Sequence, residues 1–419
     1  MINRRVSKAK ALVVFSVINL ILILAVIKFY KLSLIISLKG KSFPETRRIL
    51  LARDTNKKSC VPKKNVVFIK THKTGSSTIT NILSRYGDRN NFAFVLPKDG
   101  HNRLGWPWFL KLDHVLHYNN TKPNILSSHS RYNRAVLEQL MPNDTVYVTI
   151  LRDPVTQFES TFSYMGFGKL LGITNKSDPL IAFFENPKEI LVNYLLTQDL
   201  RIYSDRLKLI RNGMFFDLGL EPKDFENKDK IDKSIKDLNS QFHLVMLMEH
   251  FDESLVLLKQ LLCWDINDMI YFHLNERHTS QKRTHFSNSL IDKIRNWSFA
   301  DVKLYEHFRK VLIDKLSHQD EDFNNEVKSL QFRNYYHKHS CLTENDDATT
   351  QGLYDANVRT FTIRQHITSA LRRTCDRMLW DEIKYLKYLR KKQDEMFRTK
   401  TSWFDSIPGY KWFTSTVFS

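Results

Sequence analysis

Short apolar runs alternate with amphipathic stretches through the middle of the chain. Residues 66–69, 145–151 and 242–248 are runs of the length expected for buried strands. The stretch 254–264 repeats leucines at helical spacing. Further short strands are predicted at 92–96 and 124–128, and further helices at 289–310 and 384–400. The pattern predicts an α/β domain with a central, mainly parallel sheet and flanking helices.

The longest apolar run lies near the N-terminus. Residues 11–27 have Ser16 and Asn19 as their only polar members and carry basic residues on both sides. The run is near the lower limit for a spanning helix, and no small-residue cleavage site follows it. We expect a cytoplasmic tail over 1–10, one transmembrane signal-anchor over 11–31, a stem over 32–64 and a luminal domain over 65–419. A cleaved signal peptide is the alternative.

The stretch after the first strand has the features of an anion site. Gly75 breaks the chain, and the hydroxyl residues 76–78 are predicted to cap the helix that follows. Such a loop aims backbone N–H groups and the helix dipole at one point, where Lys73 adds a positive charge. It is not a Walker A loop, because its single glycine follows the lysine. The alternative is a capped helix with an exposed lysine.

A second anion-binding pattern follows the strand 145–151. Asp153 is predicted to be an N-cap and Pro154 the first helical residue, so Arg152 lies at the carboxyl end of a strand. Ser160 falls about two turns into the helix. An arginine fork and a hydroxyl can hold a second phosphate, whereas the alternative is a structural role for both.

A histidine follows another strand end. His129 comes directly after 124–128, so three strands would deliver Lys73, His129 and Arg152 to one edge of the sheet, where open α/β sheets bind ligands. A lone histidine is more often structural than catalytic. The turn 105–108 supplies aromatic side chains for an acceptor pocket or for ordinary packing.

The net charge, the glycosylation sequons and the cysteines limit the ligands and the compartment that the sequence suits. The formal net charge of +19 suits an anionic ligand, an acidic glycan or a lipid head group, and no nucleic-acid motif accompanies it. No spacing typical of a metal site occurs. Four glycosylation sequons favour a luminal domain: Asn119, Asn143, Asn175 and Asn296. The four cysteines, Cys60, Cys263, Cys341 and Cys375, allow three pairings, of which we favour Cys341–Cys375 because both lie in the C-terminal part.

These motifs together resemble the galactose 3-O-sulfotransferase family. The likeness runs with gaps from about Asn65 to Tyr388 and implies a P-loop-like sulfotransferase fold. It is carried by Thr71-His72-Lys73-Thr74-Gly75-Ser76-Ser77-Thr78, by Arg152 with Ser160, by Ser128-His129-Ser130-Arg131-Tyr132, by Phe215-Phe216-Asp217-Leu218-Gly219, and by residues 241–264 and 271–277.

The resemblance implies that 3′-phosphoadenylyl sulfate is the donor, and the lack of metal-site spacings predicts that no metal is bound. Residues 73–78 would hold its 5′-phosphosulfate, and Arg152 with Ser160 its 3′-phosphate. His129 would be the catalytic base, with His72 as the rival base or a second donor to the sulfuryl group. Lys282 and Arg283 lie where a related loop closes over the nucleotide, although a solvated charge run is the account that we favour for them.

By resemblance, the acceptor is the 3-hydroxyl of a terminal β-galactose, on galactosylceramide-type glycolipid or on glycoprotein glycans, and the enzyme resides in the Golgi membrane. A uronyl 2-O-sulfotransferase of glycosaminoglycans and a non-catalytic glycan-binding relative are the alternatives. The aromatic C-terminal end, residues 403–418, is expected to lie against the luminal leaflet or to pack on the domain. The oligomeric state stays open, with a homodimer among the permitted states.

Overall fold

The structure, a computed structural model, describes residues 60–118, 121–173, 176–197, 204–274, 283, 285–343, 349–351 and 357–405. The chain divides into two units, Met1–Cys60 and Val61–Ser419, and all elements below belong to the second. The predicted tail, signal-anchor (11–31) and most of the stem lie outside the described residues. Among the helices of the described ranges, none combines the length and apolarity needed to cross a membrane.

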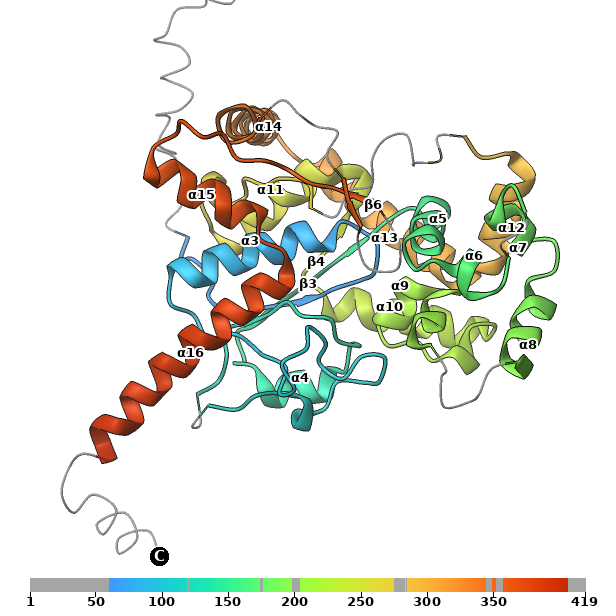
Figure 1. Ribbon diagram of the computed structural model, residues 1–419, viewed down its shortest axis with the longest axis horizontal. Coiled ribbons are helices and arrows are strands. Elements are labelled where there is room, and N and C mark those ends of the chain that lie inside the picture. Colours follow the sequence, from blue (N-terminus) through green and yellow to red (C-terminus); the bar gives the residue numbers. More distant parts are fainter. Residues whose placement is uncertain are drawn as a thin grey trace, which may run out of the picture. The chain divides into compact units, whose positions relative to one another are not determined.

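A four-stranded parallel sheet forms the centre of this unit (Figure 1). Every residue of the four strands is buried, as expected for a parallel sheet covered on both faces. In spatial order the strands are β2 (Ile125–Leu126), β1 (Val66–Ile69), β3 (Val146–Leu151) and β4 (Leu244–Leu247). After β1 the chain forms β2 on one side of β1, and it then crosses to form β3 on the opposite side of β1. The order of the strands therefore reverses between β1 and β3, and such a point is where open α/β sheets bind ligands.

Helices flank the sheet and bury its apolar faces. In Figure 1, α3 (Ser76–Arg89) and α11 (Phe251–Leu262) lie above the sheet and α4 (Arg134–Leu140) lies below it. The other helices are α5 (Pro154–Tyr164), α6 (Phe167–Leu170), α7 (Pro179–Phe183), α8 (Pro187–Thr197), α9 (Gly213–Asp217), α10 (Lys228–Gln241), α12 (Asn288–Trp297), α13 (Phe299–Ser317), α14 (Glu321–Cys341), α15 (Ser369–Leu379) and α16 (Glu382–Asp405). A short antiparallel pair, β5 (Thr349–Gln351) and β6 (Asn357–Arg359), completes the elements.

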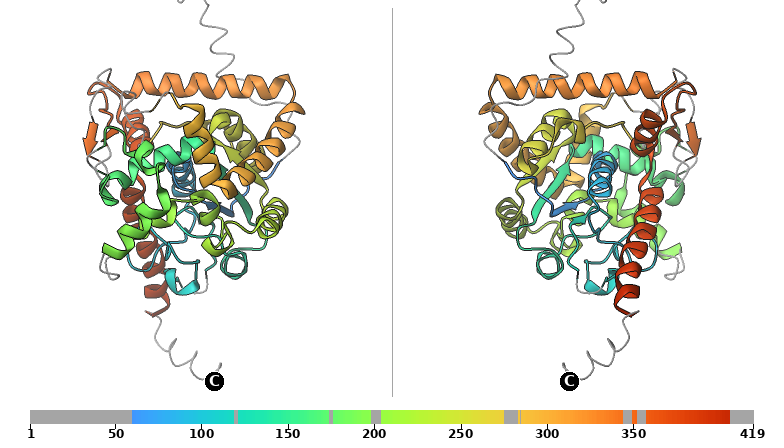
Figure 2. Two further views of the ribbon diagram at one scale, coloured as in Figure 1. Left: turned by 90° about the vertical axis from the view of Figure 1, so that its right-hand side faces the viewer. Right: turned by 90° about the vertical axis from the view of Figure 1, so that its left-hand side faces the viewer.

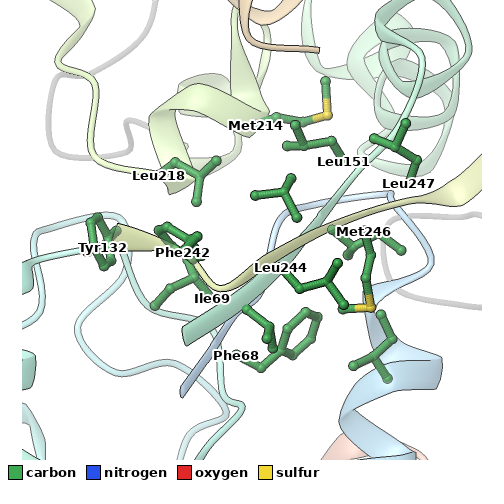
Figure 3. Packing of buried hydrophobic residues seen from close by; sticks show 14 of the residues in the cluster. Phe68, Ile69, Tyr132, Leu151, Met214, Leu218, Phe242, Leu244, Met246 and Leu247 are labelled. Carbon is green, nitrogen blue, oxygen red and sulfur yellow. The ribbon is translucent and has the colours of Figure 1, made fainter. Parts of the chain in front are cut away.

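The core links the strand ends to α9. Figure 3 shows Leu151 of β3 beside Met214 of α9, with Leu218 and the β4 side chains close by. These side chains are almost fully buried. Since a close-packed core resists displacement, α9 is fixed relative to the carboxyl edge of the sheet.

The predicted α/β architecture with a parallel central sheet is confirmed, and several element boundaries differ from the sequence prediction. The predicted strand 92–96 is wrong: Phe94 makes only an isolated bridge to Ile125. The amide of Gln393 on α16 bonds the Phe94 N–H and carbonyl instead, taking the place of a neighbouring strand. The strand predicted at 124–128 shortens to Ile125–Leu126. The helix predicted over 289–310 is two helices, because the backbone leaves helical geometry at Ser298.

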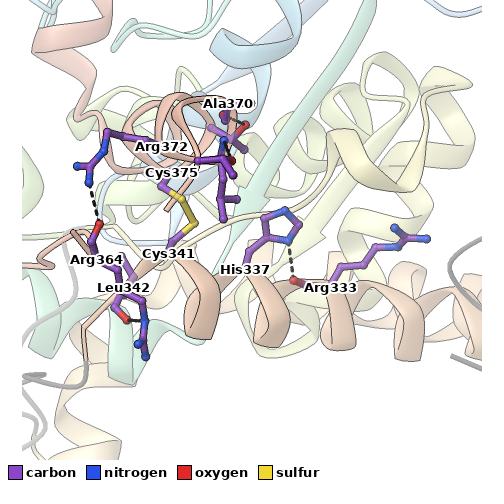
Figure 4. Close-up of a disulfide and its surroundings, with 11 residues drawn as sticks. Arg333, His337, Cys341, Leu342, Arg364, Ala370, Arg372 and Cys375 are labelled. Carbon is purple, nitrogen blue, oxygen red and sulfur yellow. Dashed lines mark hydrogen bonds between the residues drawn. A yellow bond between two sulfur atoms is a disulfide. The ribbon is translucent and has the colours of Figure 1, made fainter. Parts of the chain in front are cut away.

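The C-terminal region is fastened to the first βα unit. Figure 2 shows α16 (red) beside α3 (blue), and Lys392 of α16 bonds Asp88 of α3 at 2.8 Å. Figure 4 shows the disulfide between Cys341 and Cys375, which joins α14 to α15 and confirms the favoured pairing. Cys60 and Cys263 are each disulfide-bonded as well. The predicted basic helix 384–400 is confirmed as α16, whereas residues 406–419 of the aromatic end lie outside the described ranges.

Candidate active site

The loop between β1 and α3 is held in a tight turn by buried hydroxyls. Thr71 and Thr74 bond through their Oγ1 atoms at 2.8 Å, and Ser76 Oγ donates to the Thr71 carbonyl at 2.7 Å. Gly75 has a φ of 79°, and a Cβ there would lie 2.6 Å from Met248 Sδ. The chain therefore requires glycine at this turn.

The predicted capping of α3 by residues 76–78 is wrong. Gly75 is the N-cap, and no side chain caps the helix. The hydroxyl of Ser76 turns back to the loop because the Thr71 carbonyl lies within its reach. The first turn of α3 therefore presents backbone rather than capping side chains, which is the arrangement that binds anions at helix N-termini.

The two predicted anion sites adjoin. Arg152 Nη1 donates to the carbonyl of Lys73 at 3.2 Å, and Arg152 Nε donates to Thr156 Oγ1 at 3.1 Å. Ser160 is buried on α5 four residues after Thr156, so the two hydroxyl residues share one helix face. Lys73 Nζ lies 3.6 Å from the ring centroid of Tyr164, at the end of the same helix. Both cations thus lie where the strand order reverses.

His72 is held by a buried carboxylate. Asp217, at the end of α9, accepts the backbone N–H of His72 at 2.9 Å and its Nδ1 at 2.8 Å through Oδ2. Its other oxygen accepts Trp106 Nε1 at 2.9 Å. Because a carboxylate only accepts hydrogen bonds, Nδ1 of His72 carries a proton, and Nε2 is the atom that can accept one in the neutral ring.

His129 stacks on His72, with ring centroids 4.3 Å apart and an interplanar angle of 22°. Burial, followed by the nearby positive charge of Lys70, holds the pKa of His129 well below its ordinary value. The ring is therefore neutral at pH 7. Its Nε2 lies 4.0 Å from Glu382 Oε2, and its buried Nδ1 has no hydrogen-bond partner among the described residues.

Comparison with known proteins assigns the chain to a family. The model of the family described as galactose-3-O-sulfotransferase matches residues 1–393. The chain is 32% identical to galactosylceramide sulfotransferase of Mus musculus over 352 residues, which are 79% of each chain. It is 31% identical to galactose-3-O-sulfotransferase 2 of Homo sapiens over 344 residues, 78% of this chain and 83% of the relative.

The chain belongs to the galactose-3-O-sulfotransferase family. It is accordingly a carbohydrate sulfotransferase, and the resemblance read from the sequence is confirmed. Two of the family-like stretches are joined in space: Arg131 Nε donates to the Phe216 carbonyl, and the Tyr132 N–H donates to the Asp217 carbonyl, both at 2.9 Å. The stretch around His129 therefore also supports the turn that holds His72.

Sequence reasoning missed three residues of the site. Asp217 lies in the family-like stretch 215–219, but the sequence does not show that its carboxylate binds His72. Lys70 is almost fully buried directly after β1, and its ammonium donates to Glu382, a residue 312 positions later in the chain. A lysine ending an apolar strand is a local signal that could have been noticed, whereas nothing in the sequence around Glu382 distinguishes it.

Other predicted residues lie elsewhere or have structural partners. Arg283 bonds Asp178, the N-cap of α7, and Lys282 lies outside the described residues. Trp106 is buried beside His72, whereas Trp108 is 67% exposed. Asn143 and Asn296 are exposed, as glycosylation requires, and Asn119 and Asn175 lie outside the described residues. Within the described ranges, no group of potential metal ligands occurs.

Asp301 of α13 anchors the other end of α9 and leads to a pH prediction. Its carboxylate accepts the N–H groups of Met214 at 3.2 Å and Phe215 at 2.8 Å. Burial raises the pKa of Asp301 from its ordinary 3.8 to about 7. The folded protein then binds this proton more tightly than the unfolded chain does, so the Asp301 contribution to stability falls as pH rises from about 4 to about 7.

We expect Asp301→Asn to flatten this dependence, by up to about 4 kcal/mol over that range. Urea unfolding of the wild type and the variant at pH 5 and pH 7.5 measures the difference. An unchanged pH dependence in the variant contradicts the assignment.

Proposed function

We propose that this sulfotransferase moves the sulfuryl group of 3′-phosphoadenylyl sulfate to the 3-hydroxyl of a terminal β-galactose. The observation that carries the proposal is the hydrogen bond from Arg152 to the Lys73 carbonyl, because it joins two anion sites at the point where the strand order reverses. A donor with two separate anionic ends suits two adjoining sites better than a nucleotide with a single polyphosphate tail. The likeness to the galactose-3-O-sulfotransferases supports the same donor and acceptor.

The residues of the site fit the donor. The first turn of α3, with Lys73 and the backbone N–H groups of the loop, is suited to the 5′-phosphosulfate. Arg152 and Ser160 are suited to the 3′-phosphate, since the arginine fork forms paired hydrogen bonds. The hydrogen bonds of Thr74 and Ser76 to Thr71 hold the loop in this form.

The chemistry that these residues support is an in-line displacement, for which positioning and electrostatics suffice. The bond from the galactose oxygen to sulfur forms as the bond from sulfur to the phosphate oxygen breaks. Lys73 balances the negative charge that grows on the leaving oxygen. The hydroxyl proton passes to a histidine.

We assign the base to His72 rather than to His129, which ranked first on sequence alone. The carboxylate of Asp217 orients His72 Nδ1–H and stabilises the imidazolium that forms when Nε2 takes the proton. His129 lacks such a partner on its buried Nδ1 within the described residues. A base held by a carboxylate gains more from proton transfer than a ring whose pKa is held low, chiefly by burial.

The acceptor carrier and the location are part of the proposal. The named relatives include galactosylceramide sulfotransferases, which supports a galactose-terminated glycolipid, with glycoprotein galactose as the second candidate. We place the catalytic unit in the Golgi lumen behind a single N-terminal anchor, as the apolar run 11–27 indicates. A role in glycolipid synthesis follows from that acceptor.

An acceptor panel tests the proposal. Radiolabelled sulfate transfer from the donor is measured to galactosylceramide, to an N-acetyllactosamine glycan and to heparan precursor. We expect transfer to the galactose-terminated acceptors at the 3-hydroxyl and none to heparan. Transfer to the heparan precursor alone supports a uronyl 2-O-sulfotransferase, and binding without any transfer supports a glycan-binding relative; either result overturns the proposal.

A further inference from the structure

An ion pair in the candidate active site belongs to neither anion site. The Lys70 ammonium donates to Glu382 Oε2 at the start of α16, and the two side chains are 2% and 11% exposed. A carboxylate beside a site for an anionic donor requires explanation, because it repels the donor unless its charge is balanced. Lys70 supplies that balance, so the pair as a whole is neutral.

Two polar atoms around this pair lack hydrogen-bond partners among the described residues. They are Glu382 Oε1 and His129 Nδ1, and both are buried. Buried polar atoms are nearly always hydrogen-bonded to protein, water or ligand. Glu382 Oε2 lies 4.0 Å from His129 Nε2, so the two residues are neighbours that each have a polar atom available to a ligand. A carboxylate only accepts, whereas a neutral imidazole both donates and accepts, so hydroxyl groups satisfy both residues.

We propose that Glu382 binds the acceptor sugar, accepting hydrogen bonds from galactose hydroxyls near the one that is sulfated, with His129 as its neighbour in the same subsite. The inference rests on the proposed function and adds the residue that selects an uncharged sugar. The rings of His129 and His72 stack at 4.3 Å, which places this subsite directly beside the proposed base.

The C-terminal helix holds Glu382 in a fixed position. Asn81 of α3 donates to the Trp380 carbonyl at 3.0 Å, just before α16 begins. Further along, Gln393 bonds Phe94 and Lys392 bonds Asp88. A binding group fixed in this way loses little conformational entropy when the sugar binds.

The Glu382→Gln variant of the full chain tests the proposal with methyl β-galactoside as the acceptor. The amide keeps the shape and an oxygen for Lys70 but loses the charged acceptor. We expect the KM for methyl β-galactoside to rise about 10- to 100-fold, the loss expected for a charge-assisted hydrogen bond. The KM for the donor is not expected to rise, because the anion sites are intact and the positive charge of Lys70 is no longer balanced.

The chain offers a matched control in Glu326→Gln. Glu326 of α14 also pairs with a buried lysine, Lys259 of α11, and it too has a buried carboxylate oxygen without a partner in the described residues. Loss of its charge perturbs a similar ion pair outside the candidate active site. We expect its KM for methyl β-galactoside to equal that of the wild type.

Deoxy sugars identify the contact. The 4-deoxy and 6-deoxy analogues of methyl β-galactoside are compared in the wild type and in Glu382→Gln. For the wild type, we expect at least one deoxy analogue to have a higher KM than methyl β-galactoside. In Glu382→Gln the same analogue and methyl β-galactoside are expected to have equal KM values, because the carboxylate that bound the missing hydroxyl is already gone. An acceptor KM in Glu382→Gln equal to that of Glu326→Gln overturns the inference. Failure of the wild type to sulfate any β-galactoside instead overturns the proposed function.

Discussion

Replacing Lys73 with alanine is expected to lower kcat/KM for sulfuryl transfer at least about 10³-fold, because the positive charge beside the leaving oxygen is lost. The fold is expected to persist. The Lys73 side chain is half-buried and lies over Tyr164, while the hydrogen bond from Arg152 reaches its backbone carbonyl, which alanine keeps. Transfer of radiolabelled sulfate to methyl β-galactoside measures the loss.

Two further variants complete this test. Lys328→Ala removes an exposed lysine from α14 and is expected to leave turnover unchanged. Arg152→Ala is expected to be as inactive as Lys73→Ala, since it removes both the second anion contact and the hydrogen bond that holds the loop. Turnover of Lys73→Ala within about tenfold of the wild type, in a protein with an unchanged thermal midpoint, contradicts the site.

The second large effect concerns the proposed base. His72→Ala is expected to lower kcat about 10²- to 10⁴-fold, the usual contribution of a general base. Asp217→Asn is expected to lower kcat as well, because an amide can donate to Nδ1 and so favours the wrong tautomer of the imidazole. Steady-state kinetics over a range of pH measures both, and the limb that reports deprotonation of the base is expected to vanish in His72→Ala.

His129→Ala separates the two histidines. We expect this variant to raise the acceptor KM more than it lowers kcat, since His129 lies beside Glu382 in the acceptor subsite. The opposite result would be a near-normal kcat in His72→Ala and a kcat lowered about 10²-fold or more in His129→Ala. That result assigns the base to His129.

Asp217 is the residue on which the arrangement depends most. It receives three hydrogen bonds through its carboxylate, from the His72 backbone, the His72 ring and Trp106. The backbone carbonyls of Phe216 and Asp217 accept hydrogen bonds from Arg131 and Tyr132, which lie much earlier in the sequence. Asp301 holds the opposite end of the short helix α9. The orientation of the proposed base is therefore set by contacts from several distant segments.

Local chemistry explains what could be predicted from the sequence. The strands at 66–69, 145–151 and 242–248 were recognisable because a buried parallel strand is a continuous apolar run. The glycine of the first loop and the Asp153–Pro154 start of α5 were recognisable because they depend on backbone geometry at single positions. The motifs and their order along the chain were enough to show the resemblance to the galactose 3-O-sulfotransferase family.

Errors arose where distant groups compete with local ones. Ser76 was expected to cap α3, but the Thr71 carbonyl takes its hydroxyl. Residues 92–96 were expected to form a strand, but a glutamine of α16 takes the hydrogen bonds that a neighbouring strand would provide. Helix and strand propensities depend on residues that are close in the sequence, so they do not account for hydrogen-bond partners that folding brings from distant segments.

The amino-acid sequence alone determined the alternation of strands and helices, the two candidate anion-binding motifs and the cationic residue that each contains. Only the tertiary structure decided that these motifs adjoin, that Asp217 orients His72, and that Glu382 of the C-terminal helix lies beside His129. The reason is physical: a motif is encoded by residues adjacent in the chain, whereas Lys70 and Glu382, 312 positions apart, meet only when α16 packs against α3.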